Sequence, residues 1–193
     1  MTERSFFLVP FPAPAIPRIS ITGEISLQHG VVELRYSLTG KIGEVFIPTK
    51  SMNPVRKGEL WKTTCFEFFL ATKGQSQYWE FNMSPSGDWN VYHMDAYRRI
   101  GFGEEMSIQQ LPFEVQQETN GFSLDAVADL NPIIQPNQVL EFGITAVIQT
   151  TDAHESFWAL VHPMSLADFH VRESFILGLA EQAHLSSQSA PDG

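Results

Sequence analysis

The residues best suited to chemistry in this chain are two glutamates in neighbouring aromatic-rich runs. Glu67 lies in Cys-Phe-Glu-Phe-Phe-Leu, residues 65–70, and Glu80 lies in Tyr-Trp-Glu-Phe-Asn-Met, residues 78–83. Each run alternates in character, as half-buried strands do. Two carboxyl groups on neighbouring strands can accept hydrogen bonds from a ligand. They can also act as acid and base in glycoside hydrolysis, where their separation decides the mechanism.

The second run is predicted to form a hairpin with the residues that follow it. Ser-Pro-Ser-Gly, residues 84–87, stands between the two arms, and Pro and Gly supply the backbone angles of a reversal. A tight turn would place Glu80 opposite His93 and Phe81 opposite Tyr92. Because side chains alternate across a strand, this register predicts an apolar face of Trp79, Phe81, Tyr92 and Met94, and a polar face of Tyr78, Glu80, Asn82, Trp89, His93 and Asp95.

The first run has its own two faces. Phe66, Phe68 and Leu70 are uniformly apolar and should face the core, which leaves Glu67 on the ligand-facing side, with Trp61 near the start of the strand. The single cysteine, Cys65, excludes an internal disulfide and is expected to be a buried, inert thiol.

The remaining chain is expected to consist of further strands and turns. Two hairpins are predicted, at 19–28 with 31–38 and at 113–119 with 121–130, turning at His29-Gly30 and Asn120-Gly121. A central strand is expected at 139–151, shorter strands at 5–11, 44–48, 157–162 and 174–180, and a polar connection at 97–110.

About ten strands and no long helix predict an all-β fold, a two-sheet antiparallel β-sandwich of the jelly-roll or immunoglobulin-like kind. The length of 193 residues suits one domain, which we place at 1–180. The polar residues 181–193 are expected to form a disordered tail.

Charge and composition restrict the partners. A formal net charge of −10 argues against nucleic acid and anionic membranes, and it fits a neutral or cationic small ligand. The sequence shows no signal peptide and no segment long enough to span a membrane, so a cytoplasmic protein is expected. The oligomeric state is left open.

No metal or cofactor is predicted. His93 and Asp95 share a strand face, and His162 and His170 lie near the C-terminus, but their spacing matches no tight ligand signature. Haem and calcium are conceivable ligands without a supporting motif.

Four blocks of sequence resemble the DOMON-like proteins, a group related to the type-nine carbohydrate-binding modules, and look especially like their bacterial stand-alone members. The blocks are residues 60–69, 78–89, 157–163 and 168–175. The resemblance implies a sandwich of two antiparallel sheets and a non-catalytic, sugar-binding role. It implies that Glu67 bonds sugar hydroxyls and that Trp61 supplies one of two clamping rings. Phe169 stands where the relatives carry the second, a tryptophan.

The sequence therefore predicts a module that binds a small ligand, a carbohydrate, without catalysis. An aromatic ring can stack on a pyranose while charged and amide groups bond its hydroxyls. The predicted binding residues are Trp61, Glu67, Glu80, Asn82, Trp89, Arg98 and Phe169. Three alternatives stay open: a glycoside hydrolase that uses Glu67 and Glu80, a haem-binding DOMON domain, and an interaction module that pairs through strand edges.

Overall fold

The architecture comes from a computed structural model, which describes residues 2–180, with the side chains of 100–102 excepted. The tail predicted at 181–193 lies outside the described residues. The strands are β1 (Thr2–Pro10), β2 (Ile19–Gln28), β3 (Val31–Gly40), β4 (Cys65–Thr72), β5 (Tyr78–Met83), β6 (Trp89–Ala96), β7 (Arg99–Glu104), β8 (Phe113–Glu118), β9 (Gly121–Asp129), β10 (Val139–Gln149), β11 (Glu155–Ala159) and β12 (Leu177–Ala180). Three short 3-10 helices accompany them: η1 (Ile42–Glu44), η2 (Leu60–Lys62) and η3 (Arg172–Ser174).

All strand pairings between these elements are antiparallel, which confirms the all-β prediction. The hydrogen-bonded path runs β7-β6-β5-β4-β10-β11-β1-β2-β3-β9-β8, and β12 pairs with β10. The path is continuous because β1 pairs with β2 along most of its length and with β11 at Val9 and Pro10. The described residues thus form one curled sheet, and its division into two separate sheets stays a prediction.

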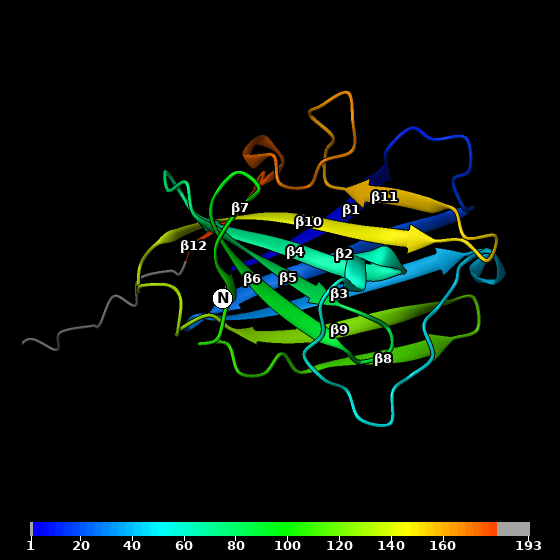
Figure 1. Cartoon of the computed structure of the whole chain (residues 1–193), viewed down its shortest axis with the longest axis horizontal. Helices are drawn as coiled ribbons and strands as arrows, with labels where there is room; N and C mark the ends of the chain where they lie inside the picture. Colours follow the sequence, from blue (N-terminus) through cyan, green and yellow to red (C-terminus); the bar gives the residue numbers. More distant parts are fainter. Residues whose placement is uncertain (1, 181–193) are drawn as a thin grey trace, which may run out of the picture.

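The sheet curls so that its two halves pack against each other. In Figure 1, β4, β5 and β10 cross in front of β2 and β3. Tyr36 of β3 lies 5.0 Å from Phe66 of β4 between ring centroids, and Phe66 lies 5.5 Å from Phe122 of β9. Such aromatic contacts bury large apolar areas and dominate core energetics. The side of β4 and β5 that faces away from this core is therefore available for a site.

Several predicted elements are confirmed and others are wrong. Both hairpins, at β2–β3 and β8–β9, and the central strand β10 lie where the pattern placed them. The strand expected at 44–48 is wrong, because η1 and a single bridge from Val45 to Thr150 occupy this region. The connection expected at 97–110 contains β7.

The register of the β5–β6 hairpin also differs from the prediction. Residues 84–88 form a longer loop, and Met83 pairs with Trp89. Glu80 consequently lies opposite Tyr92, and Trp79 opposite His93. A slip of one residue exchanges the two faces of a strand, so every side chain of β6 faces the side opposite to the one predicted.

A long connection between β11 and β12, residues 160–176, runs above β10 and β11 in Figure 1. Phe175 from this connection packs 5.5 Å from Phe69 and 5.7 Å from Tyr78. A Cβ at Gly143 would come within 2.9 Å of the Phe175 ring, so this glycine allows the close approach. The connection thereby covers part of the outer face and encloses a pocket beside it.

Candidate functional site

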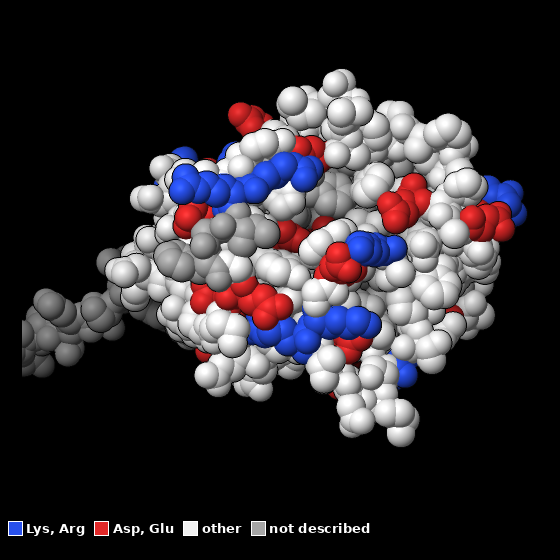
Figure 2. Space-filling model, in the orientation of Figure 1, with Lys and Arg blue, Asp and Glu red and all other residues white. Residues whose placement is uncertain are grey.

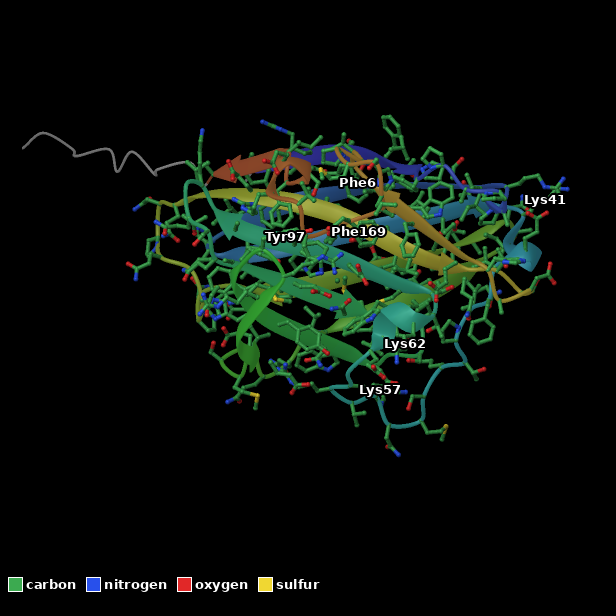
Figure 3. All side chains as sticks on the ribbon, turned by 45° about the horizontal axis from the view of Figure 1, so that its top comes forward. Phe6, Lys41, Lys57, Lys62, Tyr97 and Phe169 are labelled. Atoms are coloured by element: carbon green, nitrogen blue, oxygen red, sulfur yellow. The ribbon has the colours of Figure 1, made fainter. Side chains whose placement is uncertain are left out.

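A pocket of about 470 Å³ lies between the outer face of β4, β5 and β6 and the 160–176 connection. Figure 2 shows acidic atoms inside a hollow of this face and basic atoms around it. In Figure 3, Phe169 and Lys62, which both line the pocket, lie apart from each other, with Lys62 below Phe169 in the view. The lining consists of Trp61, Lys62, Glu67, Phe69, Glu80, Tyr92, Met94, Arg98, Val147, Glu155, Phe157, Ala167, Asp168, Phe169 and His170.

Glu67 and Glu80 belong to the same wall of the pocket. Glu67 pairs with Asn82 across β4 and β5, and Glu80 stands two residues from Asn82 on the same strand face. Only 2% of Glu67 and 6% of Glu80 is exposed. Period-two alternation therefore placed both carboxyl groups on the face opposite the core, as predicted, although at the base of a pocket rather than on an open surface.

The Glu67 carboxyl is incompletely bonded. Its Oε2 accepts a hydrogen bond of 3.3 Å from Thr145 Oγ1, whereas its buried Oε1 has no hydrogen-bond partner. Burial raises the pKa of Glu67 well above its usual range, and the nearby negative charge of Glu80 raises it further. A buried acceptor without a donor is costly, and the raised pKa favours the neutral, protonated carboxyl group.

Glu80 is better supported. Asn82 Nδ2 donates a hydrogen bond of 2.8 Å to Glu80 Oε1. Burial raises the pKa of Glu80, and the Asn82 bond and the charge of Arg98 oppose that increase. Asn82 is fully buried and is absent from the pocket lining, so it positions Glu80 rather than presenting its amide to the cavity.

His170 faces Glu80 across the pocket. Its Nδ1 lies 2.9 Å from the Tyr78 hydroxyl, which also accepts a hydrogen bond from the Arg98 backbone N–H. The hydroxyl proton is then best used as a donor to Nδ1, which assigns the hydrogen of the neutral ring to Nε2. Burial and the charge of Arg98 lower the pKa of His170 to about 4. A neutral Nε2–H donor therefore lies 3.9 Å from Glu80 Oε2.

The edge of the pocket is closed by an ion pair between two segments. Arg98 Nη2 lies 3.0 Å from Asp168 Oδ1, and the Tyr97 hydroxyl donates to Asp168 Oδ2 at 2.5 Å. Burial works to raise the pKa of Asp168, but the hydrogen bonds from Tyr97 and Arg98 outweigh it and lower the pKa. Arg98 has a φ of 52°, a conformation that few non-glycine residues adopt. These contacts fasten the 160–176 connection to the β6–β7 turn.

Aromatic rings form the other walls. Trp61, from η2, is 39% exposed and packs edge-on to Tyr92 with centroids 5.8 Å apart. Phe169, from the 160–176 connection, lies 6.0 Å from Phe157 and 6.5 Å from Phe69. The pocket thus combines ring surface with buried carboxyl groups.

The structure brings most of the predicted site residues together. Trp61, Glu67, Glu80, Arg98 and Phe169 line the pocket, and Asn82 supports it from beneath. Their part in ligand binding stays a prediction.

The position predicted for Trp89 is wrong. Trp89 pairs with Met83, shares its core-side face and packs against the main core, with the Arg56 guanidinium 4.3 Å above its ring. The five-residue loop at 84–88 is the physical reason, since it shifts β6 by one residue relative to the assumed tight turn.

Sequence reasoning missed other pocket residues. Tyr92 and Met94 were assigned to the apolar core face and in fact line the pocket, and His170 and Asp168 were not predicted to join it. The run Ser-Pro-Ser-Gly-Asp, which is long enough for a five-residue loop, is the signal that could have identified Tyr92 and Met94.

Within residues 2–180 no group of three or more His, Cys, Asp or Glu side chains is arranged to hold a metal ion. Cys65 is fully buried, and burial raises the pKa of its thiol well above the usual value, as expected for an inert cysteine. A search for a membrane-spanning helix among the described residues found none with the necessary length and apolarity.

Comparisons with known proteins find solved structures of similar fold. No family model matches the sequence, and no curated protein matches it. A protein of Bacteroides uniformis proposed to bind carbohydrate superposes with a TM-score of 0.67 at 12% identity, covering 90% of this chain and 85% of its own. A family 9 carbohydrate-binding module from Caldicellulosiruptor kristjanssonii, solved with cellotriose, gives a TM-score of 0.60 at 10% identity, covering 98% of this chain and 88% of its own. This chain therefore shares the fold of a family 9 carbohydrate-binding module.

Proposed function

We propose that this protein binds a carbohydrate in the pocket between β4–β6 and the 160–176 connection, and that it does so without catalysis. The observation that carries the proposal is a cavity walled by aromatic rings, with two buried carboxyl groups, Glu67 and Glu80, in its lining. The volume of about 470 Å³ falls within the usual range of small-ligand pockets, about 300–1,000 Å³. The shared fold with a module that was solved with cellotriose adds support.

The pocket offers complementary groups for a pyranose. Trp61, partly exposed at the mouth, offers a ring on which the apolar face of a sugar stacks. Sugar hydroxyls donate to Glu67 and Glu80, and the Nε2–H of His170 donates to a sugar oxygen. Phe169 supplies the second ring. Arg98, through its ion pair with Asp168, holds the 160–176 connection that carries Phe169.

Three further parts of the proposal go with it. The chain is a DOMON-like protein related to the type-nine modules, on the strength of the four sequence blocks. The two halves of its curled sheet correspond to the two sheets of a β-sandwich of the jelly-roll or immunoglobulin-like kind. It acts in the cytoplasm.

Hydrolysis by Glu67 and Glu80 is the weaker alternative. A glycosidase needs two carboxyl groups whose surroundings push their pKa values apart, so that one is an acid and the other a base. Burial raises the pKa of both groups here. The preference for binding over hydrolysis therefore rests on the fold shared with a carbohydrate-binding module, and the reducing-sugar assay tests it.

Haem binding is disfavoured by the surroundings of His170. Met94 and His170 both line the pocket, but Nδ1 of His170 bonds Tyr78 and Nε2 faces Glu80 at 3.9 Å. An absorption spectrum of the purified protein tests this alternative directly, since a bound haem gives a strong visible band.

Titration calorimetry with glucose, cellobiose and cellotriose tests the proposed function. We expect saturable binding that Trp61→Ala weakens at least about tenfold, which corresponds to about 1.4 kcal/mol. Trp89→Phe is the matched control, because Trp89 lies on the core side of the sheet and its replacement should leave affinity unchanged. Absence of binding by any of these sugars, or equal losses in the two variants, would contradict the proposal. A reducing-sugar assay on the same samples should show no turnover.

A further inference from the structure

The two buried carboxyl groups of the pocket have no positive partner among the described residues. Lys62 Nζ lies 2.7 Å from Glu59, outside the lining, and Arg98 is paired with Asp168 at 3.0 Å. The nearest basic side chain, His170, lies 3.9 Å from Glu80, but burial holds its ring in the neutral form. The two cations that line the pocket, Lys62 and Arg98, are therefore paired with other carboxylates, and only the more distant charge of Arg98 acts on Glu80.

The unmet hydrogen-bonding capacity lies on the same wall. Glu67 Oε1 has no donor, and Glu80 Oε2 has only His170 at 3.9 Å, beyond ordinary hydrogen-bond reach. A buried carboxyl group is stable in its ionised form only when it is paired and hydrogen-bonded, so a bound cation would favour ionisation of both groups. A primary ammonium group carries one positive charge and three donors, which matches two carboxyl groups better than a neutral hydroxyl with one donor does.

The remaining walls also favour a cation. Trp61 and Tyr92 meet edge-on at 5.8 Å, and Phe69 and Phe169 at 6.5 Å, and these rings line the same pocket as the carboxyl groups. Ring faces attract cations. Glu155 of β11 adds another carboxyl group to the lining, and β4 and β10 lie between its strand and β5, which carries Glu80.

We propose that the ligand of this pocket is an amino sugar, whose ammonium group is bound between Glu67 and Glu80 while its ring lies against Trp61. The inference rests on the proposed carbohydrate binding and specifies its substrate class. Since the acidic wall would repel an anion, the pocket rejects sugars that carry a carboxylate.

Calorimetry with four related monosaccharides at neutral pH tests the inference: glucosamine, glucose, N-acetylglucosamine and glucuronate. We expect glucosamine to bind at least about tenfold more tightly than glucose. N-acetylglucosamine, which carries the same nitrogen without its charge, should lose this advantage, and glucuronate should bind least. Ethanolamine serves as an ammonium probe without a sugar ring and should bind more weakly than glucosamine.

Two variants assign the preference to the carboxyl groups. Glu67→Gln and Glu80→Gln should each reduce the glucosamine preference over glucose several-fold, whereas Glu114→Gln, the same change at an exposed position of β8, should keep it. Circular dichroism checks that each variant is folded, and if one is not, the wild-type comparison still decides.

The possible outcomes separate the two proposals. Glucose binding as tightly as glucosamine, with loss in Trp61→Ala, overturns the amino-sugar inference and keeps carbohydrate binding. Failure of every sugar to bind overturns the proposed function itself. Binding of ethanolamine without binding of any sugar also overturns it, and indicates an ammonium ligand that is not a sugar.

Discussion

Replacing His170 with asparagine should make the protein less sensitive to acid. Burial and the charge of Arg98 lower the pKa of His170 from 6.5 to about 4, so the folded protein holds a neutral ring that the unfolded chain would protonate below pH 6.5. The nearby Glu80 gives little compensation, because burial raises its own pKa and favours its neutral form. The amide introduced by His170→Asn would keep an oxygen near the position of Nδ1 that can accept the hydrogen bond from Tyr78.

The expected magnitude follows from linkage. Between pH 6.5 and about 4 the unfolded state binds more protons than the folded state, so the free energy of unfolding falls as the pH falls through this window. At about 1.4 kcal/mol for each pH unit, the difference between 6.5 and about 4 corresponds to about 3 kcal/mol. This is a large share of the roughly 5–15 kcal/mol that stabilises a typical domain.

Urea unfolding of the wild type and His170→Asn, from neutral pH down to the pKa of about 4, measures the effect. The difference in free energy of unfolding should move in favour of the variant by about 3 kcal/mol across this range. An NMR titration of the His170 ring supplies an independent reading of its pKa. A ring that titrates near 6.5, or a difference in stability that does not change with pH, would refute the buried neutral histidine.

Three other perturbations probe the same pocket. Glu67→Gln should become more stable relative to the wild type as the pH rises from acid to neutral, by up to about 1.4 kcal/mol per pH unit. The reason is that burial raises the pKa of Glu67, so the folded wild type must hold a proton that its unfolded chain releases. Urea unfolding at several pH values measures the difference, and an equal pH dependence of the two proteins would contradict this prediction. Asp168→Asn should loosen the 160–176 connection by weakening the contacts of residue 168 with Tyr97 and Arg98. Amide hydrogen exchange at residues 164–170 should become faster, with little change in the melting temperature. Unchanged exchange would show that these contacts do not hold the connection in place. Trp89→Ala should lower the free energy of unfolding by about 2–4 kcal/mol, because a core-side ring is lost. Calorimetry should detect no change in sugar affinity. A loss of affinity without a loss of stability would show that Trp89 belongs to the binding site.

The faces of β4 could be predicted from sequence alone. Phe66, Phe68 and Leu70 are buried in the main core, and Glu67 faces the pocket, because strand alternation has a period of two and one strand needs no partner to express it. The hairpin at β2–β3 followed in the same way, since His29-Gly30 takes up the positive φ angles that a tight turn requires.

The faces of β6 could not be predicted with the same security. They depend on how many residues the β5–β6 loop contains, and the loop of 84–88 is longer than a tight turn. Tyr92 therefore reached the pocket and Trp89 the core, the reverse of the prediction. A local pattern specifies that two faces exist, but the pairing with the neighbouring strand decides which is which.

The sequence by itself determined that this chain forms antiparallel strands and that Glu67 and Glu80 share one side of them. Only the tertiary structure decided that this side is a pocket, because residues 160–176 pack against it and bring Asp168, Phe169 and His170 to carboxyl groups that lie about ninety to a hundred residues earlier. Alternation along a strand is a local property of the backbone, whereas the enclosure of a cavity and the burial that raises or lowers each pKa depend on contacts between distant segments.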